Sequence, residues 1–98
     1  MVSQLAAQQK KADPIVGTYD WHNGEVVVIR ADGSATSKAK KEEAAGRWVV
    51  NPYGGGGYVI MWEGGYIESL KLRKNSSQLA GKGLDSAGKV YTVTGTKR

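Results

Sequence analysis

Apolar and polar residues alternate with a period of two from Ile15 onward, rather than with the 3.6-residue period of a helix. Clusters of Gly, Asn, Asp and Ser interrupt this alternation at short intervals, as is typical of turns between strands. We therefore expect a run of short antiparallel strands. They lie near residues 15–21, 25–30, 34–38, 46–50, 58–62, 66–73, 78–82 and 90–96. Short connections between consecutive strands predict a β meander.

Two hairpins in this pattern share the same order of residues. The first spans residues 19–24 (Tyr-Asp-Trp-His-Asn-Gly), and the second spans residues 60–65 (Ile-Met-Trp-Glu-Gly-Gly). Glycine adopts the positive φ that closes a tight turn, and tryptophan packs across the strand pair. The repeat indicates either a duplicated four-strand unit or independent use of the same turn chemistry.

We expect the meander to close into a barrel. An open sheet exposes unpaired strand edges, and pairing of the first strand with the last removes them. Glycine and threonine at residues 17–18 and 95–96 allow two strands to approach and bend, so we expect the seam there. The predicted fold is all-β, a single small antiparallel meander barrel of about eight short strands. Its longest loops are expected at residues 39–45 and 51–57.

The chain divides into a short tail, residues 1–14, and a barrel domain, residues 15–98. The tail contains good helix formers, with Ser3 as a candidate N-cap, but few apolar residues that could form a buried face. We expect a short helix or a disordered segment that ends at Asp13 and Pro14, because proline stops a helix at the residue before it.

Composition excludes several classes of site. With 98 residues the chain has room for one domain, and without cysteine it forms neither disulfides nor thiolate zinc sites. Its single histidine, His22, rules out a metal site built from several histidines. We therefore expect no metal and no cofactor. The longest apolar run, residues 26–29, is too short to span a membrane, so we expect no membrane insertion. Composition assigns no cellular compartment.

Charge is unevenly distributed. The formal net charge is +5, and residues 71–98 hold seven basic side chains against Asp85 as the single acidic one. Lysines of this kind protect edge strands and solvent faces from aggregation. They can also bind a polyanion. Our alternative hypothesis is therefore a basic β-barrel that binds nucleic acid. Its candidate contacts are Arg47, Lys71, Arg73, Lys74, Lys82 and Lys89.

Several short motifs support a resemblance to known barrels. They are Gly-Thr-Tyr at 17–19, Asp-Gly at 32–33, Gly-Arg-Trp at 46–48, Tyr-Val-Ile-Met-Trp at 58–62, Leu-Lys-Leu at 70–72 and Leu-Ala-Gly at 79–81. Together they resemble a small bacterial all-β module, and the Gly-Thr-aromatic start and the meander are also similar to the lipocalin and avidin group of calycin barrels. Because these motifs are turns and core aromatics, the resemblance implies a fold and an accessory role rather than a reaction.

Glu68 is the titratable residue whose predicted position is most unusual. Alternation places it on the same face as Tyr66, Leu70 and Leu72, which we expect to be interior. A buried carboxylate needs a partner, and the candidates are Arg30, Arg47 or a tyrosine hydroxyl. The residue is either a ligand-binding group in the barrel mouth or a structural anchor.

The aromatic residues suggest a binding role. We expect Trp21 and Tyr53 to be exposed near turns, where rings can stack on a ligand, whereas Trp62 serves mainly in packing. Asp20 and His22 lack a neighbouring nucleophile, so we expect no catalytic residue and no enzyme activity. The first hypothesis is a non-enzymatic accessory module that binds a carbohydrate, peptide or protein partner at one loop end. Its candidate ligand site consists of Trp21, His22, Asn23, Tyr53, Tyr58 and Glu68.

Overall fold

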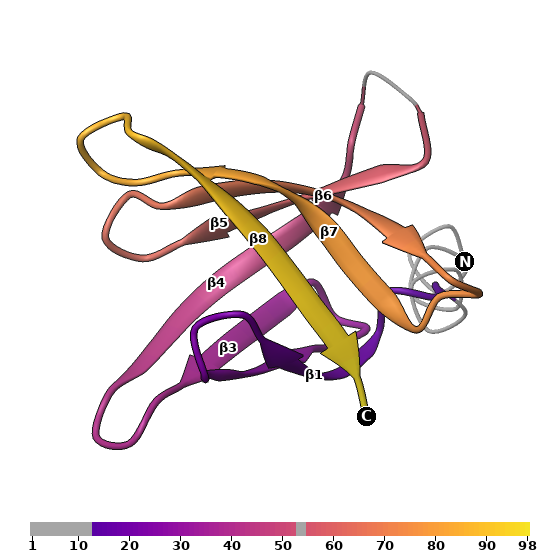
Figure 1. Ribbon diagram of the computed structural model, residues 1–98, viewed down its shortest axis with the longest axis horizontal. Helices are drawn as coiled ribbons and strands as arrows, with labels where there is room; N and C mark the ends of the chain where they lie inside the picture. Colours follow the sequence, from indigo (N-terminus) through magenta and orange to yellow (C-terminus); the bar gives the residue numbers. More distant parts are fainter. Residues whose placement is uncertain (1–12, 53–54) are drawn as a thin grey trace.

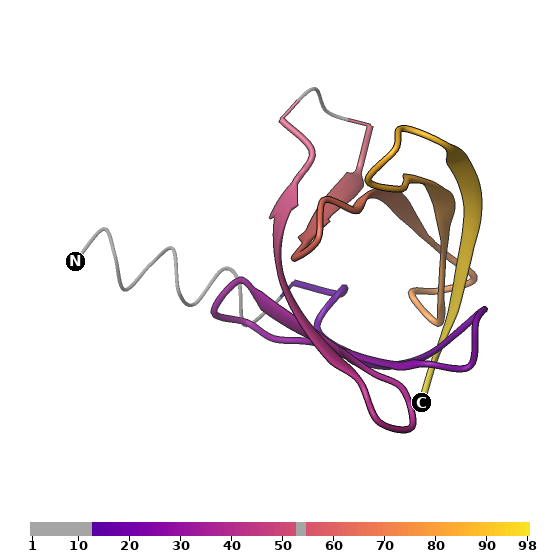
Figure 2. The ribbon, with the colours of Figure 1, turned by 90° about the vertical axis from the view of Figure 1, so that its left-hand side faces the viewer.

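The computed structural model describes residues 13–52 and 55–98 and has the architecture that the alternation predicts. Eight antiparallel strands follow one another around a closed barrel in the order of the chain (Figures 1 and 2). The strands are β1 (Gly17–Trp21), β2 (Val26–Ile29), β3 (Ser34–Lys38), β4 (Glu43–Val50), β5 (Gly57–Trp62), β6 (Ile67–Arg73), β7 (Gln78–Leu84) and β8 (Val90–Lys97). The all-β meander barrel is thereby confirmed. Most of the predicted tail, residues 1–12, and Tyr53 lie outside the described residues.

The barrel closes between β1 and β8. Trp21 pairs with Gly95 and Asp20 pairs with Thr96, which confirms one side of the expected seam. On the other side, Thr18 accepts a hydrogen bond from the Arg98 N–H (2.9 Å), directly after β8, whereas Gly17 has no partner in the β1–β8 register. The seam is therefore built from residues 18–21.

Glycine closes both of the hairpins that share a sequence pattern. The Trp21 N–H donates to the Glu25 carbonyl (2.9 Å), and Gly24 turns the chain with a φ of 86°. In the second hairpin the Trp62 N–H donates to the Tyr66 carbonyl (2.8 Å), and Gly65 has a φ of 90°. Residues other than glycine rarely adopt such a positive φ.

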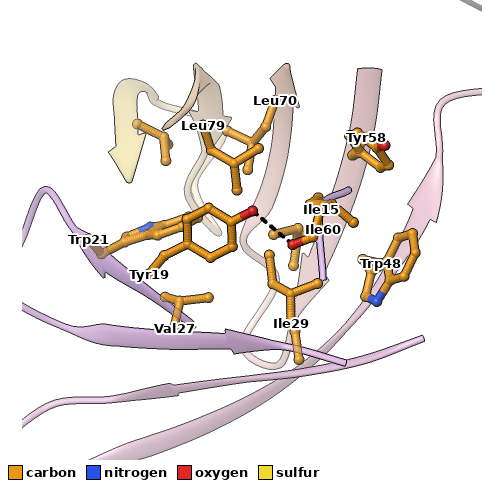
Figure 3. Packing of buried hydrophobic residues seen from close by; sticks show 12 residues of the cluster. Ile15, Tyr19, Trp21, Val27, Ile29, Trp48, Tyr58, Ile60, Leu70 and Leu79 are labelled. Carbon is orange, nitrogen blue, oxygen red and sulfur yellow. Dashed lines mark hydrogen bonds between the residues drawn. The ribbon is translucent and has the colours of Figure 1, made fainter. Parts of the chain in front are cut away.

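The interior is filled by the alternate residues that point inward from each strand (Figure 3). Tyr19 and Trp48 are its largest fully buried side chains. The Tyr19 hydroxyl donates to the Ile15 carbonyl (2.8 Å), and the Trp48 indole N–H donates to the Arg30 carbonyl (2.7 Å). The polar atoms of both rings therefore have partners inside the barrel, as buried polar groups require.

The two ends of the barrel differ. Because neighbouring strands run antiparallel in chain order, the connections at residues 22–25, 39–42, 63–66 and 85–89 meet at one end, which we call the mouth. The opposite end, the base, is closed by the segment that precedes β1. There Ile15 is completely buried, and Asp13 accepts a hydrogen bond from the Tyr58 hydroxyl (2.6 Å).

One expected loop is shorter than the sequence suggests. Residues 39–45 were expected to form a long polar loop, but β4 begins at Glu43, which pairs with Lys38, and Ala44 and Ala45 continue the ladder. Opposite charges at directly paired positions stabilise antiparallel strands, although alanine and glutamate have low strand propensity.

Within residues 13–52 and 55–98, no helix is long and apolar enough to cross a membrane.

Candidate binding site at the barrel mouth

A cavity of about 540 Å³ opens at the mouth. All four mouth hairpins and the adjoining strand ends contribute to its wall. Its lining combines four aromatic rings with five carboxylates. The rings are Trp21, Trp62, Tyr66 and Tyr91, the carboxylates are Glu25, Glu42, Glu63, Glu68 and Asp85, and the remaining lining residues are His22, Asn23, Ser37 and Ala44.

Glu68 forms the floor of this site as a buried carboxylate. It is 4% exposed, and its two oxygens accept hydrogen bonds from the Trp62 indole N–H and the Tyr91 hydroxyl, each at 2.7 Å. The predicted inward orientation is confirmed. Of the candidate partners, the tyrosine hydroxyl is confirmed, since it is Tyr91 that donates to Glu68. Arg30 instead donates to the Thr36 hydroxyl on the outer surface (3.1 Å), and Arg47 is exposed on β4. Neutral donors thus solvate the carboxylate without cancelling its charge.

Tyr91 acts as a hydrogen-bond donor in this arrangement. Burial raises the pKa of its hydroxyl above the ordinary value, and the hydrogen bond to Glu68 and the charge of that carboxylate raise the pKa further. The hydroxyl therefore stays protonated near neutral pH and keeps donating to Glu68. The Tyr66 ring meets the Tyr91 ring edge-on, with centroids 6.2 Å apart.

Three cavity rings each lie over a glycine that is their cross-strand partner. Tyr91 is paired with Gly83, Trp62 with Gly46, and Trp21 with Gly95. A Cβ atom on these glycines would lie 2.4 Å from Tyr91, 2.7 Å from Trp62 and 2.6 Å from Trp21. Because these glycines lack side chains, the three rings have room to pack against the strands and to form the cavity wall.

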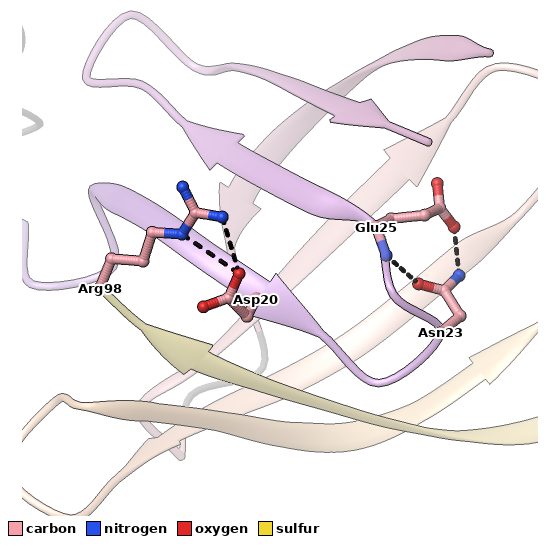
Figure 4. A network of polar contacts seen from close by, with 4 residues as sticks. All are labelled: Asp20, Asn23, Glu25 and Arg98. Carbon is pink, nitrogen blue, oxygen red and sulfur yellow. Dashed lines mark hydrogen bonds and ion pairs between the residues drawn. The ribbon is translucent and has the colours of Figure 1, made fainter. Parts of the chain in front are cut away.

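The carboxylates nearer the rim are also held by neutral donors. Glu25 accepts from the Ser37 hydroxyl (2.7 Å) and from the Asn23 side-chain N–H. Its own backbone N–H donates to the side-chain oxygen Oδ1 of Asn23 (3.1 Å; Figure 4). Glu63 accepts from the Ala45 N–H (3.0 Å), and Asp85 accepts from the Lys89 N–H (2.8 Å). These contacts orient the oxygens before any ligand arrives.

The cavity is negatively charged, although the protein as a whole carries +5. Lysine and arginine do not occur among its lining residues. In the part of the chain that the structure describes, the one ion pair joins Arg98 to Asp20 at 2.9 Å, outside the cavity (Figure 4). The described residues contain no group of three His, Asp or Glu side chains arranged to hold a metal ion.

The structure brings four of the predicted ligand residues together. Trp21, His22, Asn23 and Glu68 all line the mouth cavity. The expected exposure of Trp21 is wrong: the ring is 6% exposed, because Gly95 lets it fold against the wall. Its edge still faces the cavity.

Tyr58 lies away from these four residues. It is buried at the base, where its ring packs edge-on against Trp48 and its hydroxyl donates to Asp13. Tyr53 is not among the described residues. The candidate site therefore divides between the two ends of the barrel, and only its mouth part forms a cavity.

Sequence reasoning missed more than half of the cavity wall. Trp62 was assigned to packing, but it also binds Glu68. The missed residues include Glu25, Glu42, Glu63, Tyr66, Asp85 and Tyr91. One signal was available: each of the four mouth hairpins carries a carboxylate in or beside its turn, whereas the two fully described base turns, 30–33 and 74–77, carry only Asp32.

The residues of the nucleic-acid hypothesis do not share one surface. Lys71 and Arg73 on β6 and Lys82 on β7 point outward and line a shallow groove on the outside of the sheet. Lys74 lies in the turn after β6, Lys89 in the mouth turn before β8, and Arg47 on β4.

Comparison of the chain with protein-family models, curated proteins and solved structures finds no match. The chemistry of its surfaces is accordingly the basis for assigning a function.

Proposed function

We propose that this protein is a non-enzymatic binding module whose mouth cavity takes a positively charged group, such as a lysine or arginine side chain of a peptide or protein partner. One observation carries the proposal: four aromatic rings and five carboxylates line the cavity, and no basic side chain does.

Electrostatics favours a cation in such a cavity. Four of the five carboxylates accept hydrogen bonds from neutral N–H and O–H donors, so their charge is available to attract a ligand of opposite sign. Aromatic faces also attract cations, by roughly 0.5 to 2 kcal/mol per contact. The rings of Tyr66 and Trp62 line the cavity together with Glu63 and Glu68.

The same lining is less suited to a neutral carbohydrate. Sugar hydroxyls both donate and accept hydrogen bonds, so a sugar site usually offers both kinds of partner. In this cavity, the main donors are already directed at carboxylates: Trp62 and Tyr91 at Glu68, and Ser37 at Glu25.

The hydroxyl of Ser37 donates to a carboxylate rather than to His22, which also argues against a serine nucleophile with a histidine base.

Calorimetric titration with short peptides tests the proposal. A peptide that contains lysine or arginine should bind, whereas the same peptide with glutamine at those positions, and a neutral oligosaccharide, should bind at least tenfold more weakly, since they lack the charge. Tighter binding of the oligosaccharide than of the basic peptide would refute a cation site.

Two adjacent acidic residues provide a matched pair of variants. Glu42 lines the cavity and Glu43 does not, yet both are exposed and each change removes one charge. Glu42→Gln should lower the affinity for the basic peptide about two- to fivefold, as expected for the loss of a single rim charge, and Glu43→Gln should leave the affinity unchanged.

Tyr66→Ala should also lower the affinity for the basic peptide, with Val50→Ala at the base as its control.

A further inference from the structure

The outer face of β6, β7 and β8 carries three parallel rows of paired residues, and each row contains one basic side chain. The pairing runs across the three strands at positions that all point away from the interior. The rows are Arg73–Gln78–Thr96, Lys71–Ala80–Thr94 and Ser69–Lys82–Thr92. None of these nine positions is acidic and none is aromatic.

Of the residues on the neighbouring strands that pair with these rows, one is acidic. On one side, β5 contributes Gly57 and Val59 opposite Lys71 and Ser69. On the other side, Asp20 of β1 pairs with Thr96, but its carboxylate is bound by Arg98. The positive charge of the face is therefore not compensated locally.

The face carries a shallow, open groove of about 570 Å³. It is lined by Lys71, Arg73 and Lys82 together with Thr92 and Thr94. Gly81 also lines it and allows β6 and β7 to approach closely, since a Cβ atom there would lie 1.9 Å from the Ser69 carbonyl oxygen. The Lys82 ammonium donates to the Thr92 hydroxyl (3.0 Å), so that this cation is held over the groove.

We infer that this groove binds a linear anionic polysaccharide, with Lys71, Arg73 and Lys82 on successive sulfate or carboxylate groups. Lys71 and Arg73 are two residues apart on β6 and so lie roughly 6.6 Å apart. Lys82 lies on the neighbouring strand β7, in the next pairing row, so the three cations form a line along the strands that an extended chain can follow. Threonine hydroxyls both donate and accept hydrogen bonds, which suits the sugar hydroxyls between the charges. The surface is separate from the mouth cavity and carries the opposite charge.

The groove fits nucleic acid less well. Single-stranded nucleic acid gains roughly 1 to 3 kcal/mol per base from stacking on aromatic side chains, and none of the nine positions supplies a ring. Three strands span only about 10 Å, less than the width of the B-DNA major groove alone, so a duplex would rest on a small part of its surface.

Binding of the protein to dextran sulfate and to unsulfated dextran of the same length tests the inference. The sulfated chain should bind and the neutral chain should not. With about three ionic contacts, affinity for dextran sulfate should fall roughly tenfold or more when salt rises from about 50 to about 200 mM. Equal binding of both chains, or binding that does not depend on salt, would overturn the inference.

Two triple variants with equal loss of charge separate the groove from general attraction. The groove variant is Lys71→Gln, Arg73→Gln, Lys82→Gln, and the control is Lys38→Gln, Lys40→Gln, Lys41→Gln around the turn between β3 and β4. The groove variant should lose at least tenfold in affinity and the control less than about threefold. An equal loss in both variants would exclude the groove as the site, and oligothymidylate binding as tightly as dextran sulfate would overturn the choice of polysaccharide. Circular dichroism before each titration establishes that both variants are folded.

Discussion

The ring of Tyr91 occupies the space that a side chain on Gly83, its cross-strand partner, would fill. A Cβ atom there would lie only 2.4 Å from the ring. From this position the hydroxyl reaches the buried carboxylate of Glu68 at 2.7 Å. Gly83 on β7 therefore permits the ring position from which Tyr91 donates to Glu68 on β6.

Gly83→Ala should therefore disrupt the mouth while the barrel stays closed. The added methyl group forces the Tyr91 ring aside, and overpacking of this kind typically costs about 1 to 3 kcal/mol. We expect a lower free energy of unfolding in urea and weaker binding of a basic peptide. Tyr91→Phe is the informative comparison, since it removes the hydrogen bond and keeps the ring. If Gly83→Ala left both stability and peptide affinity unchanged, the contact would have no role in shaping the site.

Two acidic residues, Asp13 and Asp20, should differ in their contribution to the free energy of unfolding. Asp13 accepts from the Tyr58 hydroxyl and from the Ile15 N–H (3.1 Å) at the base, whereas Asp20 forms an exposed pair with Arg98. Asp13→Ala should cost about 1 to 3 kcal/mol, because the buried end of the barrel loses its acceptor. Asp20→Ala should cost less than about 1 kcal/mol, as exposed ion pairs do. Urea denaturation of both variants measures the difference, and the reverse order would show that the base does not depend on Asp13.

Trp48 should be essential for folding. The ring is 2% exposed, lies edge-on to Tyr58 and donates to the Arg30 carbonyl. Trp48→Ala removes a large core side chain, which typically costs about 3 to 5 kcal/mol, a large share of the stability of a small domain. Thermal denaturation followed by circular dichroism should show an unfolded or strongly destabilised chain. A variant with unchanged melting temperature would mean that this ring contributes little to the core.

Stability should fall on the alkaline side of neutrality. Burial, and next the charge of Asp13, raise the pKa of Tyr19 to about 12 from the ordinary value of 10.0, and the pKa values of Tyr58 and Tyr91 are raised as well. Because the folded state holds these protons more tightly than the unfolded chain, their stabilising contribution is complete below about pH 10 and is lost as pH rises through the folded pKa values. For Tyr19, this difference in pKa between the folded and unfolded states corresponds to about 3 kcal/mol of the free energy of unfolding.

The free energy of unfolding, measured in urea from about pH 8 to about pH 11, should decline above about pH 10. Tyr91→Phe should make this decline shallower, because one of the three shifted groups is gone. A free energy that stayed constant over the whole range would contradict the burial of these hydroxyls in neutral form.

The fold could be predicted from the sequence because its main signals are local. Alternation and turn residues located all eight strands, and the cost of open edges predicted closure. The start of β4 was missed because Glu43, Ala44 and Ala45 have low strand propensity and gain their place from pairing with β3.

The site was harder to predict because it depends on which connections meet. Trp21, His22 and Asn23 belong to one hairpin, so their proximity is a local property. Tyr91 reaches Glu68 only once β6, β7 and β8 are in register. Tyr58 was grouped with the mouth although its strand begins at the base, an error that the up-and-down order of the strands would have corrected.

Closure between β1 and β8 has a consequence for how the molecule is made. The seam joins residues 19–21 to residues 95–97, so the first strand has only one neighbour in the sheet until the last strand has left the ribosome. Contacts between residues so distant in sequence slow folding, because a long loop must lose entropy before they form. During synthesis the unpaired edge of β1 is open to pairing with other nascent chains.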